Sequence, residues 1–208
     1  GVPMHRALCI LFGHLSWVGV GALILRILPR PQSFFDKWYT NKMKRSDGLV
    51  QPKGNDTQWL WWTIGGYFVS SWFFNIADIV NQWILPLPIL EQASDSVVSQ
   101  LTNPEYNDIA ASVIGYIAPC LSAPWWEEVL YRGFLLPALV LQMKFKWAVL
   151  LNAVIFSAHH LSPTSALPLF VLGWTWNLLY TKSGNLFTTI MVHAMWNSRV
   201  FLGNWLGL

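Results

Sequence analysis

The sequence places two adjacent carboxylates and an arginine inside one apolar stretch, at Glu127, Glu128 and Arg132. Charged side chains at membrane depth are costly, so they are kept where they pair with one another, meet water or act in function. On a helix, Glu128 and Arg132 lie four residues apart on one face, and we expect them to form an ion pair. Glu127 is rotated away from them by about 100°. This separation favours Glu127 as a general base, provided that a second polar group shares its site.

Two more polar sets with helical spacing lie downstream. His160 follows Phe156 by four residues, and Asn197 follows His193 by four. Residues with that spacing share a helical face, so His193 and Asn197 can address the same substrate atom. A single histidine inside the membrane is more often a structural hydrogen-bonding residue. The interpretation therefore depends on the whole set rather than on any one member.

The composition is that of a membrane protein. Of 208 residues, 54% are hydrophobic and only 11% are charged, whereas about a quarter of the residues in an ordinary soluble domain are charged. Long apolar stretches recur along the whole length, so we expect a single integral-membrane domain over residues 1–208. The net charge of +3 is small and comes without strong basic clusters, which excludes nucleic acid as a partner.

The apolar segments predict an all-α fold, a polytopic membrane bundle of about seven transmembrane helices. We place these helices at residues 7–28, 59–85, 109–123, 124–143, 147–161, 166–180 and 187–206. Pro124 suits the first turn of the fourth helix, and Pro137 is expected to bend it. The basic segment 29–58 is expected on the cytoplasmic or stromal side and the acidic segment 86–107 on the outer side. Strict alternation then puts Lys144 and Lys146 outside, against the charge bias.

In their order along the chain, the three polar sets resemble the motifs of the CAAX prenyl protease and bacteriocin-processing family of intramembrane endopeptidases, also called the Abi family. Glu-Glu-x-x-x-Arg stands at 127–132, Phe-x-x-x-His at 156–160 and His-x-x-x-Asn at 193–197. The resemblance covers residues 124–208, the motif-bearing core, while residues 1–123 match only as variable N-terminal helices. The residues of the motifs look most like those of the plastid and cyanobacterial branches of the family.

The resemblance implies hydrolysis of a peptide bond without a covalent intermediate. Glu127 and His160 would be the water-activating pair, and His193 and Asn197 would stabilise the oxyanion of the tetrahedral intermediate. His159 lies beside His160, so that one ring of the two would face the site and the other would face away. We expect His160 to face the site because Phe156 sets the register of the motif.

Glu128 and Arg132 would form the supporting ion pair, and no cofactor is expected. A zinc site is the nearest alternative chemistry, because two histidines and a glutamate can make a three-ligand site with an open fourth position. The absence of a His-Glu-x-x-His motif disfavours it. A serine or cysteine triad has less support, since no serine or cysteine is recognisably paired with a base.

The leading hypothesis is thus an intramembrane endopeptidase that acts on a protein or peptide substrate and is surrounded by membrane lipid. The alternative is a non-proteolytic membrane scaffold or assembly subunit of a photosynthetic complex. Such a subunit would contact other subunits, bind chlorophyll or lipid, and lie in the chloroplast thylakoid or envelope. A transporter ranks last, because the sequence has neither inverted repeats nor paired broken helices.

Overall fold

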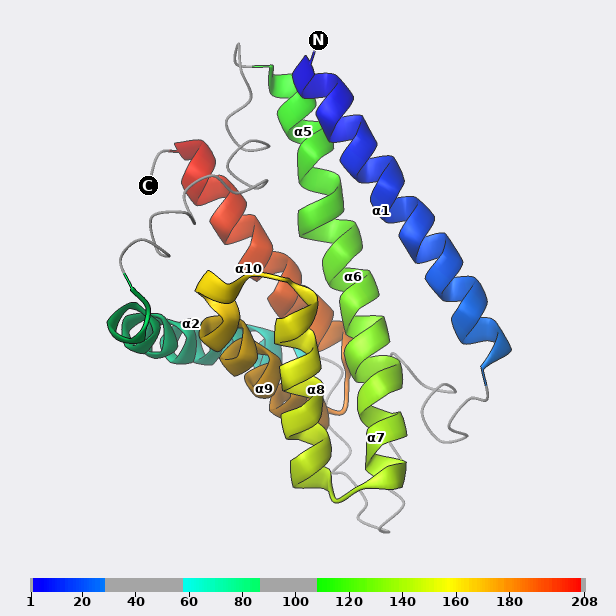
Figure 1. Cartoon of the computed structure of the whole chain (residues 1–208), viewed down its shortest axis with the longest axis vertical. Helices are drawn as coiled ribbons and strands as arrows, with labels where there is room; N and C mark the ends of the chain where they lie inside the picture. Colours follow the sequence, from blue (N-terminus) through cyan, green and yellow to red (C-terminus); the bar gives the residue numbers. More distant parts are fainter. Residues whose placement is uncertain (1, 29–57, 87–107, 207–208) are drawn as a thin grey trace. The chain divides into compact units, whose positions relative to one another are not determined.

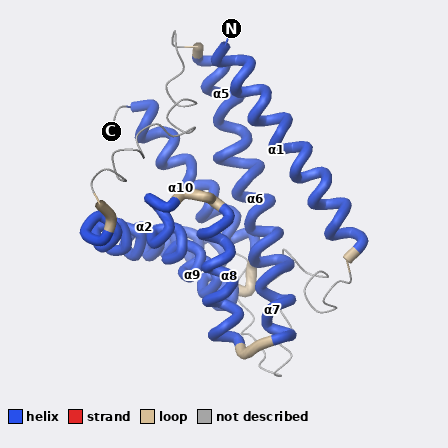
Figure 2. Tube along the Cα trace, viewed as in Figure 1, coloured by secondary structure: helices blue, strands red, loops and turns tan. Residues whose placement is uncertain are grey.

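The computed structural model describes residues 2–28, 58–86 and 108–206, and the regular structure of these residues is entirely helical. Figure 2 shows the same residues as blue helices joined by short tan connections. The predicted all-α class is confirmed. The two polar segments whose charges predicted the orientation lie almost wholly outside the described residues, so that orientation stays a prediction.

The helices follow the chain in a simple order, and Figure 1 labels the longer ones. They are α1 (Val2–Ile27), α2 (Gln58–Ile84), α5 (Ile109–Ile117), η3 (Ala118–Ser122), α6 (Ala123–Glu128), η4 (Val129–Leu135), α7 (Leu136–Gln142), α8 (Phe145–His159), η5 (Pro163–Ser165), α9 (Ala166–Ser183) and α10 (Leu186–Leu206). η3 and η4 are π-helical, and η5 is a short 3₁₀ turn.

The chain forms two compact units, whose boundaries fall inside two of the helices. Unit 1 contains α1, the segment from α5 to Trp126, and α10 from His193 onward. Unit 2 contains α2 and residues 127–192. The organisation of residues 1–208 as one domain stays a prediction.

Unit 1 is held by a small apolar cluster of Ala7, Cys120 and Phe201, which come from α1, η3 and α10. The ring of Tyr116 packs edge-on against Phe201 with centroids 5.4 Å apart. Its hydroxyl lies 2.6 Å from the hydroxyl of Ser198. Polar and apolar contacts of one side chain therefore fix α5 against the C-terminal half of α10.

Unit 2 is built around α9, which lies beside α8 (Figure 1) and also packs against α2. α8 and α9 approach closely at Gly173, where a Cβ atom would stand 2.9 Å from the ring of Phe156 and 3.2 Å from the Cα atom of Ala153. Small residues at such crossings let two backbones approach closely, as is common between membrane helices. One turn further along α9, the indole of Trp176 donates to the hydroxyl of Ser70 on α2 at 3.0 Å.

Residues 109–142 form one continuous helical run. The prediction of two helices separated at Pro124 is therefore wrong. A proline cannot donate a backbone hydrogen bond, and its ring crowds the carbonyl four residues earlier. π-helical turns, in which the donor reaches five residues back, precede both Pro124 and Pro137 and relieve this conflict: Ala123 donates to Ala118, and Leu136 donates to Tyr131.

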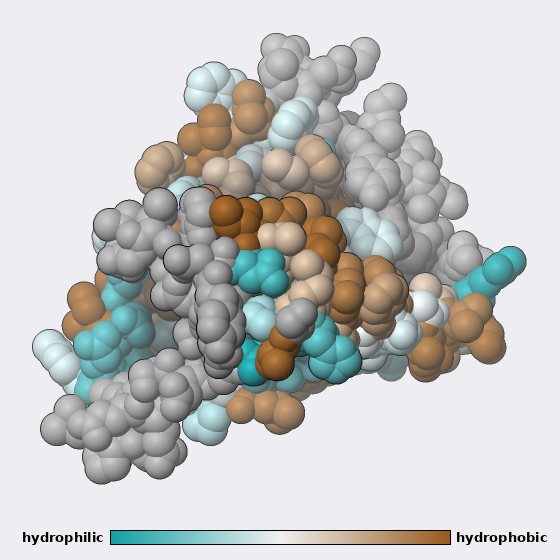
Figure 3. Space-filling view, turned by 90° about the horizontal axis from the view of Figure 1, so that it is seen from above, coloured by the Kyte–Doolittle hydropathy of each residue, from teal (hydrophilic) through white to brown (hydrophobic). Residues whose placement is uncertain are grey.

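Two helical runs are long and apolar enough to cross a bilayer, namely Val2–Ile27 and Ile109–Gln142. Large apolar side chains are exposed on other helices too, as the brown areas of the face in Figure 3 illustrate. On α2 they include Trp61, Phe68 and Trp72. Extensive exposed apolar surface is typical of contact with lipid. The count of seven transmembrane helices stays a prediction.

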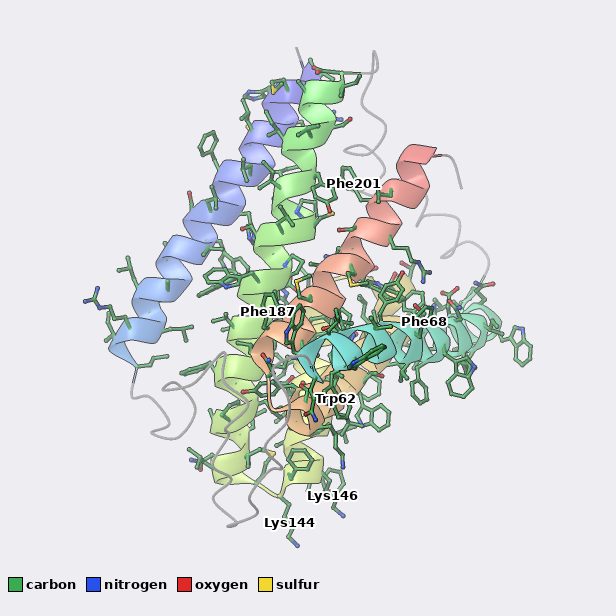
Figure 4. All side chains as sticks on the ribbon, turned by 180° about the vertical axis from the view of Figure 1, so that it is seen from behind. Trp62, Phe68, Lys144, Lys146, Phe187 and Phe201 are labelled. Carbon is green, nitrogen blue, oxygen red and sulfur yellow. The ribbon has the colours of Figure 1, made fainter. Side chains whose placement is uncertain are left out.

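The two lysines that conflict with the charge rule lie where α7 is followed by α8, Lys144 as the N-cap and Lys146 in the first turn of α8. Figure 4 shows Lys144 and Lys146 at this turn, with their side chains directed away from the helices. The ammonium group of Lys146 lies 5.3 Å from the ring centroid of Trp147. A lysine next to tryptophan is typical of a membrane–water interface, so the turn has the chemistry of a helix end at the headgroup level.

A buried ion pair links the helix that carries Glu127 to α9. Arg132 Nη1 donates to Glu128 Oε1 at 2.9 Å, and neither side chain has exposed surface. The guanidinium also donates from Nε to Asn177 Oδ1 at 3.1 Å and from Nη2 to the carbonyl of Gly173 at 3.0 Å. Its carbon lies 4.7 Å from the ring centroid of Phe156. The charge is thus neutralised, hydrogen-bonded and covered by an aromatic face.

Gly173→Ala is expected to lower the free energy of unfolding by about 1–3 kcal/mol, because the added methyl group would overlap Phe156 and the backbone of Ala153. Gly65→Ala on α2 is the matched control, since a Cβ atom there meets nothing within 4 Å. Thermal or denaturant unfolding in detergent micelles, followed by circular dichroism, measures both. Equal stability of the two variants would contradict the close approach of α8 and α9.

Arg132→Met is expected to cost about 3–5 kcal/mol, because it leaves the Glu128 charge buried without its cation. Adding Glu128→Gln should recover a large part of that loss, since the second substitution removes the uncompensated charge. The same unfolding experiment on the parent, both single variants and the double variant forms a double-mutant cycle. Strictly additive losses would show that the two residues do not act as a pair.

Candidate active site

Glu127 and His160 face each other in unit 2. Glu127 is in the last turn of α6, and His160 caps the C-terminus of α8. The distance from His160 Nε2 to Glu127 Oε2 is 3.9 Å. The His160 side chain keeps 28% of its surface exposed and the Glu127 side chain 12%. Both groups are therefore largely shielded by protein, and Glu127 Oε2 itself is buried.

The orientation of the His160 ring is fixed by Phe156. His160 Nδ1 lies 2.8 Å from the carbonyl oxygen of Phe156, four residues earlier in the same helix. A carbonyl oxygen only accepts, so Nδ1 carries the hydrogen of this bond. The neutral ring then presents the lone pair of Nε2 to Glu127. The ring of Phe156 also packs against His160 with centroids 4.8 Å apart, which gives the Phe-x-x-x-His spacing a physical cause.

The separation of the two groups suits a shared water molecule. At 3.9 Å, Nε2 and Oε2 are too far apart for a direct hydrogen bond. A carboxylate and a neutral imidazole nitrogen are both acceptors, and water can donate one hydrogen to each. A water molecule at about 2.8 Å from both atoms would satisfy this geometry. Such an arrangement can remove a proton from water and direct its oxygen at an electrophile.

His159 occupies a different environment from its neighbour. Its side chain is exposed, and its ring centroid lies 6.0 Å from that of Tyr131 and 5.7 Å from that of His160. His160 presents its Nε2 atom to Glu127 Oε2. The catalytic roles of Glu127 and His160 stay predictions.

His193 and Asn197 lie on α10 within unit 1, one helical turn apart. His193 is buried, with 3% of its surface exposed. Asn197 is partly buried, and its Nδ2 donates to the carbonyl of Pro119 at 2.7 Å. That carbonyl needs a donor because the residue five positions later in the π-helical register is Pro124, which has no N–H.

Asn197 therefore has a structural bond as well as a predicted catalytic role. A side-chain amide has two N–H groups, and the bond to Pro119 uses one of them. The second hydrogen of the same amide can still be donated to a substrate oxygen. The assignment of His193 and Asn197 to the oxyanion stays a prediction.

Two buried asparagines that the sequence analysis did not single out complete the polar network of unit 2. Asn177 accepts from Arg132 and donates through Nδ2 to the carbonyl of Val149 at 3.0 Å. Asn152 donates through Nδ2 to the carbonyl of Tyr131 at 2.9 Å. Both have no exposed surface. The signal that could have found them is an amide in the middle of an apolar segment, where polar side chains are expected to pair.

Metal-binding side chains do not gather in the part of the chain that the structure describes. Within it, no group of three or more His, Cys, Asp or Glu side chains is placed so that it could hold a metal ion. The structure thus brings Glu127 together with His160 and Glu128 together with Arg132, and it places His193 and Asn197 on one helix. The expectation that no cofactor is needed stays a prediction.

The comparisons with known proteins agree with these motifs. Residues 109–199 match the family model described as "Rce1-like: Type II CAAX prenyl endopeptidase Rce1-like". The chain is also similar to "Putative membrane peptidase YdiL" of Bacillus subtilis (strain 168), with 23% identity over 180 residues. That alignment covers 86% of this chain and 64% of the length of the relative, so the chain matches less than two thirds of that protein. No solved structure matches the chain significantly. The resemblance indicated by the three motifs is therefore confirmed as a similarity: residues 109–199 of this membrane protein match an Rce1-like CAAX prenyl endopeptidase model, which covers less than half of the chain.

Proposed function

We propose that this chain is an intramembrane endopeptidase in which Glu127 and His160 activate water to hydrolyse a peptide bond of a membrane-associated substrate. The observation that carries the proposal is the geometry of these two groups, with His160 Nε2 held at 3.9 Å from Glu127 Oε2 by the bond from Nδ1 to the Phe156 carbonyl. The peptidase family match supports a protein or peptide as the substrate.

In the proposed reaction, the water molecule loses a proton to the Glu127–His160 pair while its oxygen attacks the carbonyl carbon of the substrate. The carbonyl electrons move to the oxygen and give a tetrahedral oxyanion. When this intermediate collapses, the carbon–nitrogen bond breaks and the proton passes from the pair to the leaving nitrogen. The products are a carboxylate and an amine, and no covalent bond to the protein is formed.

The other motif residues have supporting roles in the proposal. His193 donates from its ring and Asn197 from its amide to the developing oxyanion, where a donor typically contributes a few kcal/mol to the barrier reduction. Glu128 and Arg132 hold the helix that carries Glu127 and do not touch the substrate, because both are fully buried and bonded to each other. No metal or other cofactor takes part in the proposed steps.

Neither the comparisons nor the described residues favour the scaffold alternative. The family match and the named relative both point to peptidases, and that relative is bacterial. A photosynthetic complex, bound chlorophyll and a thylakoid or envelope location have no observation in their support here. Membrane lipid remains the expected surroundings of the exposed apolar side chains.

Glu127→Gln and His160→Gln are each expected to lower kcat by about 10²–10⁴-fold, because each removes one member of the water-activating pair. The assay uses protein in phospholipid vesicles and a fluorescence-quenched peptide that ends in a prenylated Cys-aliphatic-aliphatic-X sequence. The same peptide without the prenyl group tests whether the lipid is required, and mass spectrometry identifies the bond that is cut.

His159→Gln is the matched control, since His159 is the exposed neighbour of His160. It should retain at least half of the parent activity. Full activity of the Glu127→Gln variant would refute glutamate-dependent hydrolysis, because the peptide would then be cleaved without that carboxylate.

Asn197→Ala is expected to lower kcat by about 10²–10³-fold through loss of an oxyanion donor. It also removes the bond to the Pro119 carbonyl, so it should destabilise the protein. Adding Pro124→Ala supplies a backbone N–H that can donate to the same carbonyl. The double variant should therefore recover stability but not kcat. Recovery of both would mean that Asn197 acts only in structure.

A further inference from the structure

We infer that the hydrogen bond from Asn152 to Tyr131 sets the separation of Glu127 and His160, which makes Asn152 a positioning residue for water activation. The inference rests on the proposed function, because it concerns the same pair. Asn152 lies outside the three motifs. Its proposed role also gives a reason for an amide at the centre of an apolar helix.

The two members of the pair stand on different helices. Glu127 is at the end of α6, and His160 is at the end of α8. A distance of 3.9 Å between their side-chain tips is kept only if the helical segment after Glu127 and the last turns of α8 are held in a fixed register. The relevant contacts are therefore those between η4 and α8.

One polar contact of this kind is the bond from Asn152 Nδ2 to the carbonyl of Tyr131, at 2.9 Å. Tyr131 lies one helical turn after Glu127, and Asn152 lies two turns before His160, on the same side of α8 as Phe156. The Tyr131 carbonyl also accepts the N–H of Leu136 in the π-helical register. A carbonyl oxygen has two lone pairs, so it can accept both bonds.

Aromatic packing continues this contact toward His160. The ring of Tyr131 is 3% exposed and stands edge-on to the ring of Phe156, with centroids 5.2 Å apart and planes at 85°. Phe156 in turn orients the His160 ring through its carbonyl. A continuous series of contacts thus runs from the helix of Glu127 through Tyr131 and Phe156 to His160.

Stability alone does not explain an asparagine at position 152. Asn152 is fully buried, and its Oδ1 has no hydrogen-bond partner among the described residues. A buried acceptor without a partner is unfavourable, and a leucine of similar size would avoid that cost. What leucine cannot supply is a directed bond from α8 to the Tyr131 carbonyl. The residue type therefore fits a requirement for register rather than for burial.

The first test compares Asn152→Leu with two other variants in the peptide assay. Asn152→Leu should lower kcat by about 10–100-fold with KM changed less than twofold, because misplacement by about 1 Å can reduce rates by two orders of magnitude. Tyr131→Phe keeps the ring and the carbonyl and should retain at least half of the parent kcat. Ser70→Ala removes the acceptor of the Trp176 bond elsewhere in unit 2 and should change stability without changing kcat.

The second test needs no substrate. The protein is labelled with ¹³C-histidine and studied by NMR. The signal of His160 is identified among the five histidines of the chain as the one that is lost in His160→Gln. Glu127→Gln should shift this signal. The same substitution in the Asn152→Leu background should produce less than half of that shift, because the two side chains are no longer held at the same distance. The Ser70→Ala background should leave the shift unchanged.

The outcomes separate the inference from the proposed function. If Glu127→Gln does not shift His160 in the parent protein, the pair itself is absent and the proposed function fails with it. If the shift is present but is the same in Asn152→Leu, only the positioning role is overturned. Loss of activity in Tyr131→Phe with full activity in Asn152→Leu would also overturn it, since the phenol hydroxyl rather than the backbone bond would then be essential.

Discussion

The buried guanidinium of Arg132 is the constraint on which unit 2 depends. A permanent charge without exposed surface must be neutralised and hydrogen-bonded by protein, and here Glu128, Asn177 and the Gly173 carbonyl do so. Each partner constrains a different part of the fold: Glu128 is one turn before Arg132 on its own helix, whereas the other two lie on α9. Because α8 and α9 also approach closely at Gly173, the charge and a close helix crossing share one location.

A second constraint is that the helix bearing Glu127 contains prolines. Each proline removes a backbone donor, and a carbonyl left without a partner in an apolar environment is costly. The chain meets this cost at Pro119 with an asparagine, because Asn197 donates to the carbonyl that Pro124 leaves without a backbone donor. Asn152 adds a second bond to the Tyr131 carbonyl, which already accepts from Leu136. A residue with a proposed catalytic role thus also satisfies the backbone of the helix that carries Glu127. Function and backbone satisfaction are consequently difficult to separate by single substitutions.

The ion pair of unit 2 followed from spacing alone. A four-residue separation indicated the Glu128–Arg132 pair, because such a contact lies within one helix and depends only on its period. The choice of His160 over His159 came instead from the motif of the similar family, and the bond from His160 to the Phe156 carbonyl was not predicted. The continuity of residues 109–142 did not follow, since proline usually ends a helix and π-helical turns have no simple sequence signature. Asn152 and Asn177 were also missed, because their partners are backbone carbonyls 21 and 28 residues away, which no local pattern encodes.

The π-helical segment η4 has a consequence for how this chain can change in evolution. A π-helical turn holds about one residue more than the α-helical turn it replaces, so loss of one residue from η4 would restore an ordinary helix with little rotation of the residues that follow. Loss of a residue between Glu128 and Arg132 would, however, shorten their four-residue spacing to three. A deletion after Arg132 leaves that spacing unchanged. Relatives of this chain should therefore keep the number of residues between Glu128 and Arg132 but can differ by one residue between Arg132 and Pro137.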